Sequence, residues 1–540
     1  MRFFIILTCQ LILLLAGLSS SASTYFVTFK YKTSKGVSLN NPSAYLTDKS
    51  IRRRISQRII VDSSDLPVSR AYLGIVRSLG GRVILSSKWF NGALVETSDN
   101  QANSLLLLDF VKDVRLVYSD FSSPKDCQFD KELSCVENQN SSTNAVYGGV
   151  FDQVNLLKGG FLHDNGFKGR GVTIAVLDAG FSNYENDAAF SNLRNGQVVD
   201  VYDFTTQKPK LEDNGNHGIK VLSLLAAMLP GNYCGSAVDA NYALYVTESE
   251  KYEQLIEEYF WCVAAERADS LGCDIIASSL GYNYFDNPLM DHAVCNLSKQ
   301  VVPISIAAST AFKKGIFVVV SAGNEGDKVW RYITFPADSP DVMAVGAVDR
   351  DGLLGEFSSI GLPKTVKPDV VGMGVAALMI DAAGNVVQGS GTSYAVPQIA
   401  GFSACLWQAF PFLSAVELKN VICKSSSNYS NPDNLMGYGI PNFEKAYQML
   451  KLEHNPTNRH VSVSPNPFTR SITIKTEWVY NGVVNYYMYN MQGKLVKAGH
   501  VSFAEGFTRI DDLESLPSGV IIIKLIFGDG SVEKKIVKQG

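Results

Sequence analysis

Short apolar runs alternate with longer amphipathic stretches through the middle of this chain. Residues 171–177 form a near-continuous apolar run with β-branched side chains, as expected of a strand that is buried on both faces. Similar runs recur at residues 242–246, 274–278, 316–320 and 343–348. Residues 254–271 and 304–314, which lie between these runs, have the length and apolar spacing of helices. The alternation predicts an α/β fold whose mostly parallel sheet has helices on both faces.

Two further units flank this central region, which we place at residues 121–450. Residues 23–120 combine predicted strands and helices and indicate a small α+β unit, in which Ile51-Arg52-Arg53-Arg54 is expected to form a solvated helix face. Residues 460–540 contain short alternating strands separated by turn residues, which predict a small antiparallel β-sandwich. The polar residues 451–459 are the predicted linker before it.

The first residues have the pattern of a targeting segment. Arg2 precedes an apolar run at residues 3–18, and the small residues 19–22 follow it. The run is short for a membrane span and is typical of a secretory signal peptide. We therefore expect residues 1–22 to be cleaved after Ala22 and the chain to be exported. An uncleaved signal anchor is the alternative.

Charge and cysteine content limit the classes of partner. Lys and Arg total 48 against 52 Asp and Glu, and the net charge of −4 gives no argument for binding nucleic acid or an acidic membrane. Eight cysteines remain after the signal peptide, and an even number in an exported chain permits disulfides, with Cys127 and Cys135 as the nearest pair. No Cys-x-x-Cys pair or His/Cys cluster argues for zinc.

Three polar residues stand where chemistry is commonly found. Asp178 ends the first apolar run, and open α/β sheets place their working residues at such strand ends. His217 opens a predicted helix, and Ser393 precedes another at residues 395–409. A serine hydroxyl is a poor nucleophile until a neighbouring base accepts its proton, and an aspartate can orient that base. The three residues therefore offer the parts of a Ser-His-Asp triad.

Each of these residues alone also has a structural explanation. An aspartate after a strand is commonly a turn residue, a serine before a helix is commonly an N-cap, and Gly323-Asn324-Glu325-Gly326 is by itself a turn. His217 is more distinctive, because among the six histidines it opens a helix and precedes a glycine. The joint occurrence of all four segments favours catalysis.

Together these segments resemble the subtilisin-like serine proteases, the subtilases. In that family the triad follows the order Asp, His, Ser, and residues 391–397 (GTSYAVP) match its serine signature. The resemblance implies that Asp178 orients His217, that His217 is the general base and that Ser393 is the nucleophile. It also implies that Asn324 donates its side-chain amide to the oxyanion, alongside the backbone N–H of Ser393.

The resemblance also implies where a substrate lies. Ser278, Ser279, Leu280 and Gly281 are similar to the strand that pairs with substrate backbone in subtilases, and Thr247-Glu248 belongs to the opposite wall. Binding of extended backbone implies sequence-tolerant cleavage of flexible polypeptides. The chemistry requires no cofactor. Structural calcium stays unassigned, because no ligand set can be matched.

Both flanking units carry resemblances of their own. Residues 23–120, through Ser87-Lys88-Trp89-Phe90-Asn91, look like the propeptide of Bacteroidetes subtilases, an inhibitor whose release is expected within residues 119–144. A stable accessory domain is the alternative. Pro465-Asn466-Pro467 and residues 516–520 (LPSGV) resemble the C-terminal sorting domain of type IX secretion cargo, which implies that secretion machinery as a partner and an extracellular or outer-membrane location. A substrate-binding β-module is the alternative there.

Taken together, these expectations predict that the chain is the precursor of a secreted serine endopeptidase. Its substrates would be polypeptides, and its own propeptide would be its inhibitor. Two positions depart from the family pattern, Ala179 where Ser or Thr is usual and Ile219 where Thr is usual. They leave open a catalytically inactive subtilase-fold protein that serves binding or adhesion at the cell surface. An esterase of the nucleophile-elbow type is a weaker alternative, since Ser393 lacks the second glycine of Gly-x-Ser-x-Gly.

Overall fold

Two units make up the described part of the chain, one through Ala446 and one from Tyr447, and each is considered by itself. The computed structural model describes residues 23–32, 36–119, 131–135, 146–211, 215–454, 461–476, 480, 482–504, 506–527 and 530–540. The predicted signal peptide and most of the predicted release segment lie outside these residues. Within them, no helix has both the length and the apolarity needed to cross a membrane.

Counted over the described residues, seven strands of the larger unit form one parallel sheet in the order β14-β13-β12-β11-β6-β10-β7. Their bounds are β6 Thr173–Asp178, β7 Val198–Asp203, β10 Asn241–Val246, β11 Ile275–Ser278, β12 Phe317–Ser321, β13 Met343–Val348 and β14 Val370–Met373. The five predicted apolar runs are the five inner strands, and the two edge strands β7 and β14 were missed. The predicted α/β fold is confirmed.

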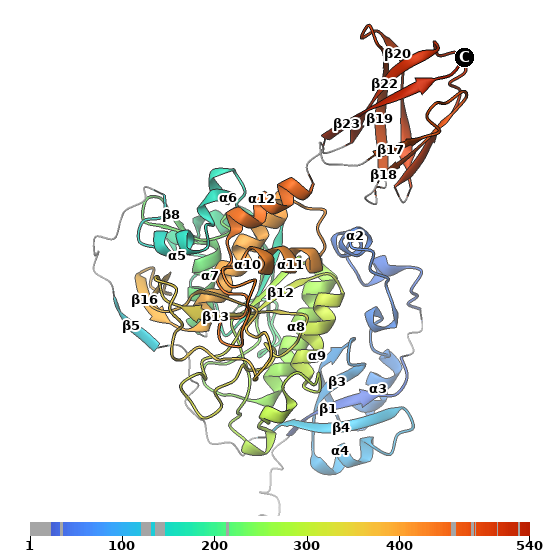
Figure 1. The fold of residues 1–540 in the computed structure, drawn as a ribbon. Helices are drawn as coiled ribbons and strands as arrows, with labels where there is room; N and C mark the ends of the chain where they lie inside the picture. The colour runs from blue at the N-terminus through green and yellow to red at the C-terminus, as the bar shows by residue number, and fades with distance from the viewer. Residues whose placement is uncertain are drawn as a thin grey trace, which may run out of the picture. The chain divides into compact units, whose positions relative to one another are not determined.

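Helices cover both faces of this sheet (Figure 1). α8 (Leu255–Leu271) and α9 (Pro303–Lys313) pack against each other on one face, and α7 (His217–Ala226) and α10 (Thr392–Ala409) on the other. α8 begins with a capping box between Gln254 and Glu257 and ends at Gly272, whose φ of 91° suits glycine. Further helices are α5 Phe151–Leu156, α6 Gly160–Asp164, α11 Ala415–Ser425 and α12 Phe443–Glu453.

A small antiparallel sheet leads into the N-terminus of α10. β16 (Val386–Ser390) pairs with β15 (Ala377–Ile380) along one edge and with β5 (Lys131–Cys135) along the other. Ser390 lies opposite Lys131 in this pairing, three residues before Ser393. β8 Met228–Leu229 and β9 Tyr233–Cys234 form a separate short hairpin.

The N-terminal region of the larger unit packs against α8. Within the described residues its four strands form an antiparallel sheet in the order β2-β3-β1-β4. The elements are β1 Ser23–Phe29, α2 Asp48–Ser56, α3 Arg70–Ser78, β2 Arg82–Ser87, β3 Gly92–Thr97, α4 Asp99–Leu105 and β4 Val111–Tyr118. Val27, Phe29, Val76 and Val95 belong to its own apolar core, while α2, β2 and β4 also contact α8. This confirms the predicted α+β unit.

One expectation for this region was wrong. Arg53 and Arg54 do not lie on a solvated helix face, because their exposed fractions are 5% and 1%. Arg53 Nη2 lies 2.6 Å and Arg54 Nη2 2.8 Å from Asp269 of α8, and Arg54 also pairs with Asp65 at 2.9 Å. The pattern of α2 alone could not show this, since Asp269 is more than 200 residues away in sequence.

The C-terminal unit is the predicted antiparallel β-sandwich. Over its described residues, one sheet has the order β17-β18-β21 and the other β20-β19-β22-β23. The strands are β17 Val461–Ser464, β18 Ile472–Thr476, β19 Gly482–Asn490, β20 Leu495–Phe503, β21 Phe507–Ile510, β22 Gly519–Phe527 and β23 Gly530–Lys538. Alternate residues of both sheets, such as Ile472, Ile474, Val484, Met488 and Ile523, share one core.

Candidate active site

Asp178 is the last residue of β6 and is fully buried. Its Oδ1 lies 2.7 Å from Nδ1 of His217 and also accepts the backbone N–H of Ala179 at 2.8 Å. An ionised carboxylate only accepts hydrogen bonds, so this contact places the donated proton on Nδ1 of His217 and leaves Nε2 as the base. The pair has the orientation that a Ser-His-Asp triad requires.

His217 is placed by the start of α7, which approaches β6 closely. Oε1 of Glu250 accepts the backbone N–H groups of Asn216 and His217 at 2.6 and 2.8 Å, which caps the first turn. A Cβ at residue 218 would lie 2.2 Å from the carbonyl oxygen of Gly180. Glycine at position 218 is therefore required for the imidazole to reach Asp178, which gives a physical reason for the His-Gly sequence.

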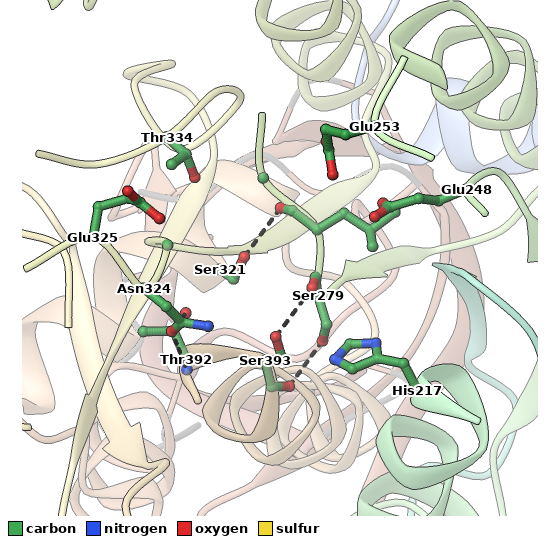
Figure 2. A pocket seen from close by; sticks show the side chains of 13 residues that line it. His217, Glu248, Glu253, Ser279, Ser321, Asn324, Glu325, Thr334, Thr392 and Ser393 are labelled. Carbon is green, nitrogen blue, oxygen red and sulfur yellow. Dashed lines mark hydrogen bonds between the residues drawn. The ribbon is translucent and has the colours of Figure 1, made fainter. Parts of the chain in front are cut away.

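Ser393 lies in the first turn of α10, where the helix dipole is positive. Its Oγ donates to the carbonyl oxygen of Ser279 at 3.2 Å, and Oγ of Ser279 donates to the carbonyl oxygen of Ser393 at 2.8 Å. His217 and Ser393 line one cavity, and Figure 2 shows the imidazole and the hydroxyl both turned toward Ser279. The structure thus brings the three predicted triad residues together.

Asn324 follows β12 and lines the same cavity. Its Oδ1 accepts both the backbone N–H and the hydroxyl of Thr392, each at 2.9 Å. These two bonds fix the orientation of the amide, and Figure 2 shows its nitrogen pointing away from Thr392 on the side of the pocket where Ser393 lies. An amide held in this way is suited to donate to an oxyanion at Ser393.

The predicted substrate-binding segment divides into two parts. Ser279, Leu280 and Gly281 line the cavity. Ser278 is buried at the end of β11, and its Oγ accepts the indole N–H of Trp261 at 2.9 Å, so it faces the core.

Two acidic residues, Glu248 and Glu253, line the cavity at the His217 side. The sequence predicted Glu248 only as part of the substrate wall opposite residues 278–281, and it did not predict Glu253. Burial, and then the charge of Asp178, raise the pKa of Glu248 to about 8. Tyr282 donates its hydroxyl to Oε2 of Glu248 at 3.1 Å. A signal existed for Glu248, because β10 runs beside β6 with Val246 opposite Asp178. Glu253 had none, since it lies in a loop before α8.

The described residues contain neither a metal-binding cluster nor a disulfide. None of their His, Cys, Asp and Glu side chains form a group of three or more that could hold a metal ion. The cysteines with described side chains, Cys234, Cys262, Cys273, Cys295, Cys405 and Cys423, are all free. The expected disulfides thus have no support there, and the side chains of the Cys127–Cys135 pair lie outside the described residues.

Three family models match the chain. They are the Subtilase family over residues 169–439, the Peptidase S8 propeptide domain of Bacteroidota over residues 24–131, and the secretion system C-terminal sorting domain over residues 462–539. The sorting domain indicates that the protein is secreted or displayed at the cell surface.

Characterised proteases are similar in sequence. Subtilisin DY of Bacillus licheniformis is 29% identical over 301 residues, which cover 54% of this chain and 97% of that protein. Serine protease AprX of Bacillus subtilis (strain 168) is 29% identical over 312 residues, which cover 52% of this chain and 66% of that protein.

Two solved structures share the fold of this chain. The Subtilase family model matches half of the sequence, which is enough to assign the chain to that family. Fervidolysin from Fervidobacterium pennivorans, a keratinolytic enzyme related to subtilisin, matches with a TM-score of 0.56 and 16% identity over 96% of this chain and 77% of that one. The epidermin leader peptide processing serine protease of Staphylococcus aureus matches with a TM-score of 0.56 and 17% identity over 79% of this chain and 99% of that one. The chain belongs to the subtilase family, the subtilisin-like serine proteases.

Proposed function

We propose that this chain is the precursor of a secreted serine endopeptidase that uses Ser393, His217, Asp178 and Asn324. The observation that carries the proposal is the 2.7 Å contact between Asp178 Oδ1 and His217 Nδ1 beside a cavity that Ser393 and Asn324 also line. Family membership supports a peptidase, and this geometry supports an intact catalytic centre.

In the proposed reaction, Oγ of Ser393 attacks the carbonyl carbon of a peptide bond while Nε2 of His217 takes its proton. Asp178 holds the imidazole and stabilises its positive charge. Asn324 and the N–H of Ser393 donate to the oxyanion. His217 then gives its proton to the leaving amine, which leaves an acyl ester on Ser393. A water molecule then attacks that ester while His217 takes its proton; the ester bond to Oγ breaks, the acid leaves, and His217 returns the proton to Oγ of Ser393.

The N-terminal unit acts in this proposal as an inhibitor that is removed during maturation. We place it at residues 23–120, with the catalytic domain at 121–450, the linker at 451–459 and the sorting domain at 460–540. β5, which follows the N-terminal unit in sequence, pairs with β16 beside Ser393. The described part of the connection between inhibitor and enzyme, β5, is thus paired with the strand that leads into the helix of Ser393.

The test compares purified full-length precursor with its Ser393→Ala variant. Wild type should shed an N-terminal piece of roughly 100 residues and then cleave casein, while the variant should do neither. A peptide and a simple ester are assayed in parallel to separate a peptidase from an esterase. Another protease can also cut the wild-type precursor between the N-terminal unit and the catalytic domain. If the protein stays inert even after this cut, the proposal fails and a binding role replaces it.

A further inference from the structure

Thr334 closes one end of the catalytic cavity. Ser279, Leu280 and Gly281 line one side of this end, and Gly323 and Asn324 line the other. Figure 2 shows Thr334 at the far side of the pocket from His217, beyond Asn324 and Ser321. The cavity thus extends from Ser393 to the side chain of Thr334, a residue to which no sequence pattern points.

The Thr334 side chain fills the gap between two glycines. A Cβ at Gly281 would lie 2.1 Å from Oγ1 of Thr334, and a Cβ at Gly323 would lie 2.8 Å from both Oγ1 and Cγ2. Real Cβ atoms essentially never come this close to another atom, so a side chain at either glycine would clash with Thr334 as it stands. The threonine is therefore part of the cavity wall and not a loosely attached side chain.

Thr334 also cannot move aside easily. It is buried, and its backbone N–H donates to the carbonyl oxygen of Ala322 at 3.0 Å. The next residue, Phe335, exchanges backbone hydrogen bonds of 3.0 and 2.8 Å with Tyr282. Both walls of the cavity are thereby tied to the segment that carries Thr334, so the depth of the cavity is fixed.

The side chain that enters this end follows from the chemistry at Ser393. The attacked carbonyl must lie between Ser393 and Asn324, and the residue that provides this carbonyl, the acyl residue, carries its side chain next to it. The cavity that runs from these two residues to Thr334 adjoins that position. The whole cavity, which includes the side near His217 and Glu248, has a volume of about 80 Å³, whereas an apolar cavity of about 150 Å³ holds benzene.

The charges at this end do not favour an ionic side chain. Glu325 lines the cavity, but its Oε1 is paired with Lys328 at 2.9 Å. Oγ of Ser321 donates to the carbonyl oxygen of Leu280 at 3.0 Å and so has its own partner. A small neutral side chain fits this lining better than a charged or aromatic one.

We infer that Thr334 restricts this protease to substrates whose acyl residue is small and uncharged, such as alanine. The inference rests on the proposed function, because it names the substrate preference of the same site. Removal of the threonine side chain opens the space between Gly281 and Gly323 and admits a larger acyl residue.

The test uses blocked tripeptide p-nitroanilides that differ only in the last residue, Ala, Val, Leu or Phe. Enzyme matured from full-length precursor should show a kcat/KM for Ala at least roughly tenfold above that for Phe, the size of effect that one or two methylene groups produce in a pocket. Thr334→Gly should change the Phe-to-Ala ratio by at least roughly tenfold in favour of Phe. Thr334→Val, which puts a methyl group in place of the hydroxyl, is the matched control for the bulk of the side chain and should keep the preference for Ala over Phe at roughly tenfold or more.

Each outcome of this test either supports or overturns the inferred preference for a small acyl residue. A wild type that cleaves Phe or Leu as well as Ala overturns the inference, as does a folded Thr334→Gly enzyme with an unchanged ratio. If Thr334→Gly does not fold, Thr334→Ser takes its place, since it loses one methyl group and should shift the ratio a few fold the same way. Absence of any hydrolysis that depends on Ser393 would instead refute the proposed function.

Discussion

Asp178 holds His217 through only one of its two carboxylate oxygens. Oδ1 lies 2.7 Å from Nδ1 of His217, whereas Oδ2 is buried and has no hydrogen-bond partner among the described residues. A buried acceptor without a donor is unfavourable. The residue after Asp178 is alanine, where the family usually has a hydroxyl residue, and this substitution fits the unpaired oxygen.

Ala179→Ser should therefore increase activity. A hydroxyl that donates to Oδ2 would stabilise the carboxylate opposite the imidazolium, and a gain of about 1 kcal/mol corresponds to roughly fivefold in kcat. The measurement is kcat of the matured enzyme on one peptide substrate. Ala179→Val adds bulk without a donor and is the control, expected to give no gain. Equal kcat for Ala179→Ser and wild type would show that Oδ2 does not limit catalysis.

The orientation of Asn324 leads to a second prediction. Thr392 donates twice to Oδ1 of Asn324, and the amide nitrogen is the donor that this side chain offers to an oxyanion. Asn324→Ala should lower kcat by about 10²–10³ with little change in KM, because the lost bond forms mainly in the transition state. Asn324→Asp keeps the shape and the acceptor but removes the donor, and it should be equally impaired. A variant with normal kcat and raised KM would assign Asn324 to ground-state binding instead.

Asp269 is predicted to anchor the N-terminal unit. Arg53, Arg54 and Lys88 of that unit all reach its carboxylate, at 2.6, 2.8 and 3.2 Å. Asp269→Asn removes the anion that these three cations share, although Arg54 keeps its pair with Asp65, and breaking such a buried pair typically costs about 3–5 kcal/mol. In a Ser393→Ala background, which prevents self-cleavage, the N-terminal unit should unfold at lower temperature and be degraded faster by trypsin. Asp200→Asn, which affects the partly exposed pair with Arg267, is the control and should change little.

The same anchor should be sensitive to acid. Burial by itself raises the pKa of Asp269, but Lys88, Arg53 and Arg54 together hold it below its ordinary 3.8. A carboxylate with a lowered pKa stabilises the packed state above its ordinary pKa and loses that contribution as pH falls toward the lowered value. The unfolding temperature of the N-terminal unit in the Ser393→Ala precursor, followed by thermal unfolding, should thus fall below about pH 4. An Asp269→Asn precursor that responds to acid as strongly would assign the effect to other groups.

The sequence predicted those features that depend on local pattern. The inner strands are continuous apolar runs. The candidate catalytic residues lie at the ends of predicted elements: Asp178 at the end of a strand, and His217 and Ser393 at the starts of helices. Arg53 and Thr334 were not predictable in this way. Their roles come from Asp269 and from Gly281 and Gly323, which only the folded chain brings beside them.

Glu248 should make the protein less stable as pH rises. Its pKa is raised from 4.5 to about 8, first by burial and then by the charge of Asp178. The unfolded chain releases this proton near pH 4.5 and the folded protein only near pH 8, so the free energy of unfolding falls across that window. Glu248→Gln stays neutral and is free of this loss. Measured in the Ser393→Ala background, its Tm should exceed that of the parent by about 2 °C or more at pH 9, and the gap should shrink toward pH 5. Parallel profiles for the two proteins would mean that Glu248 is already ionised in the folded state at pH 5.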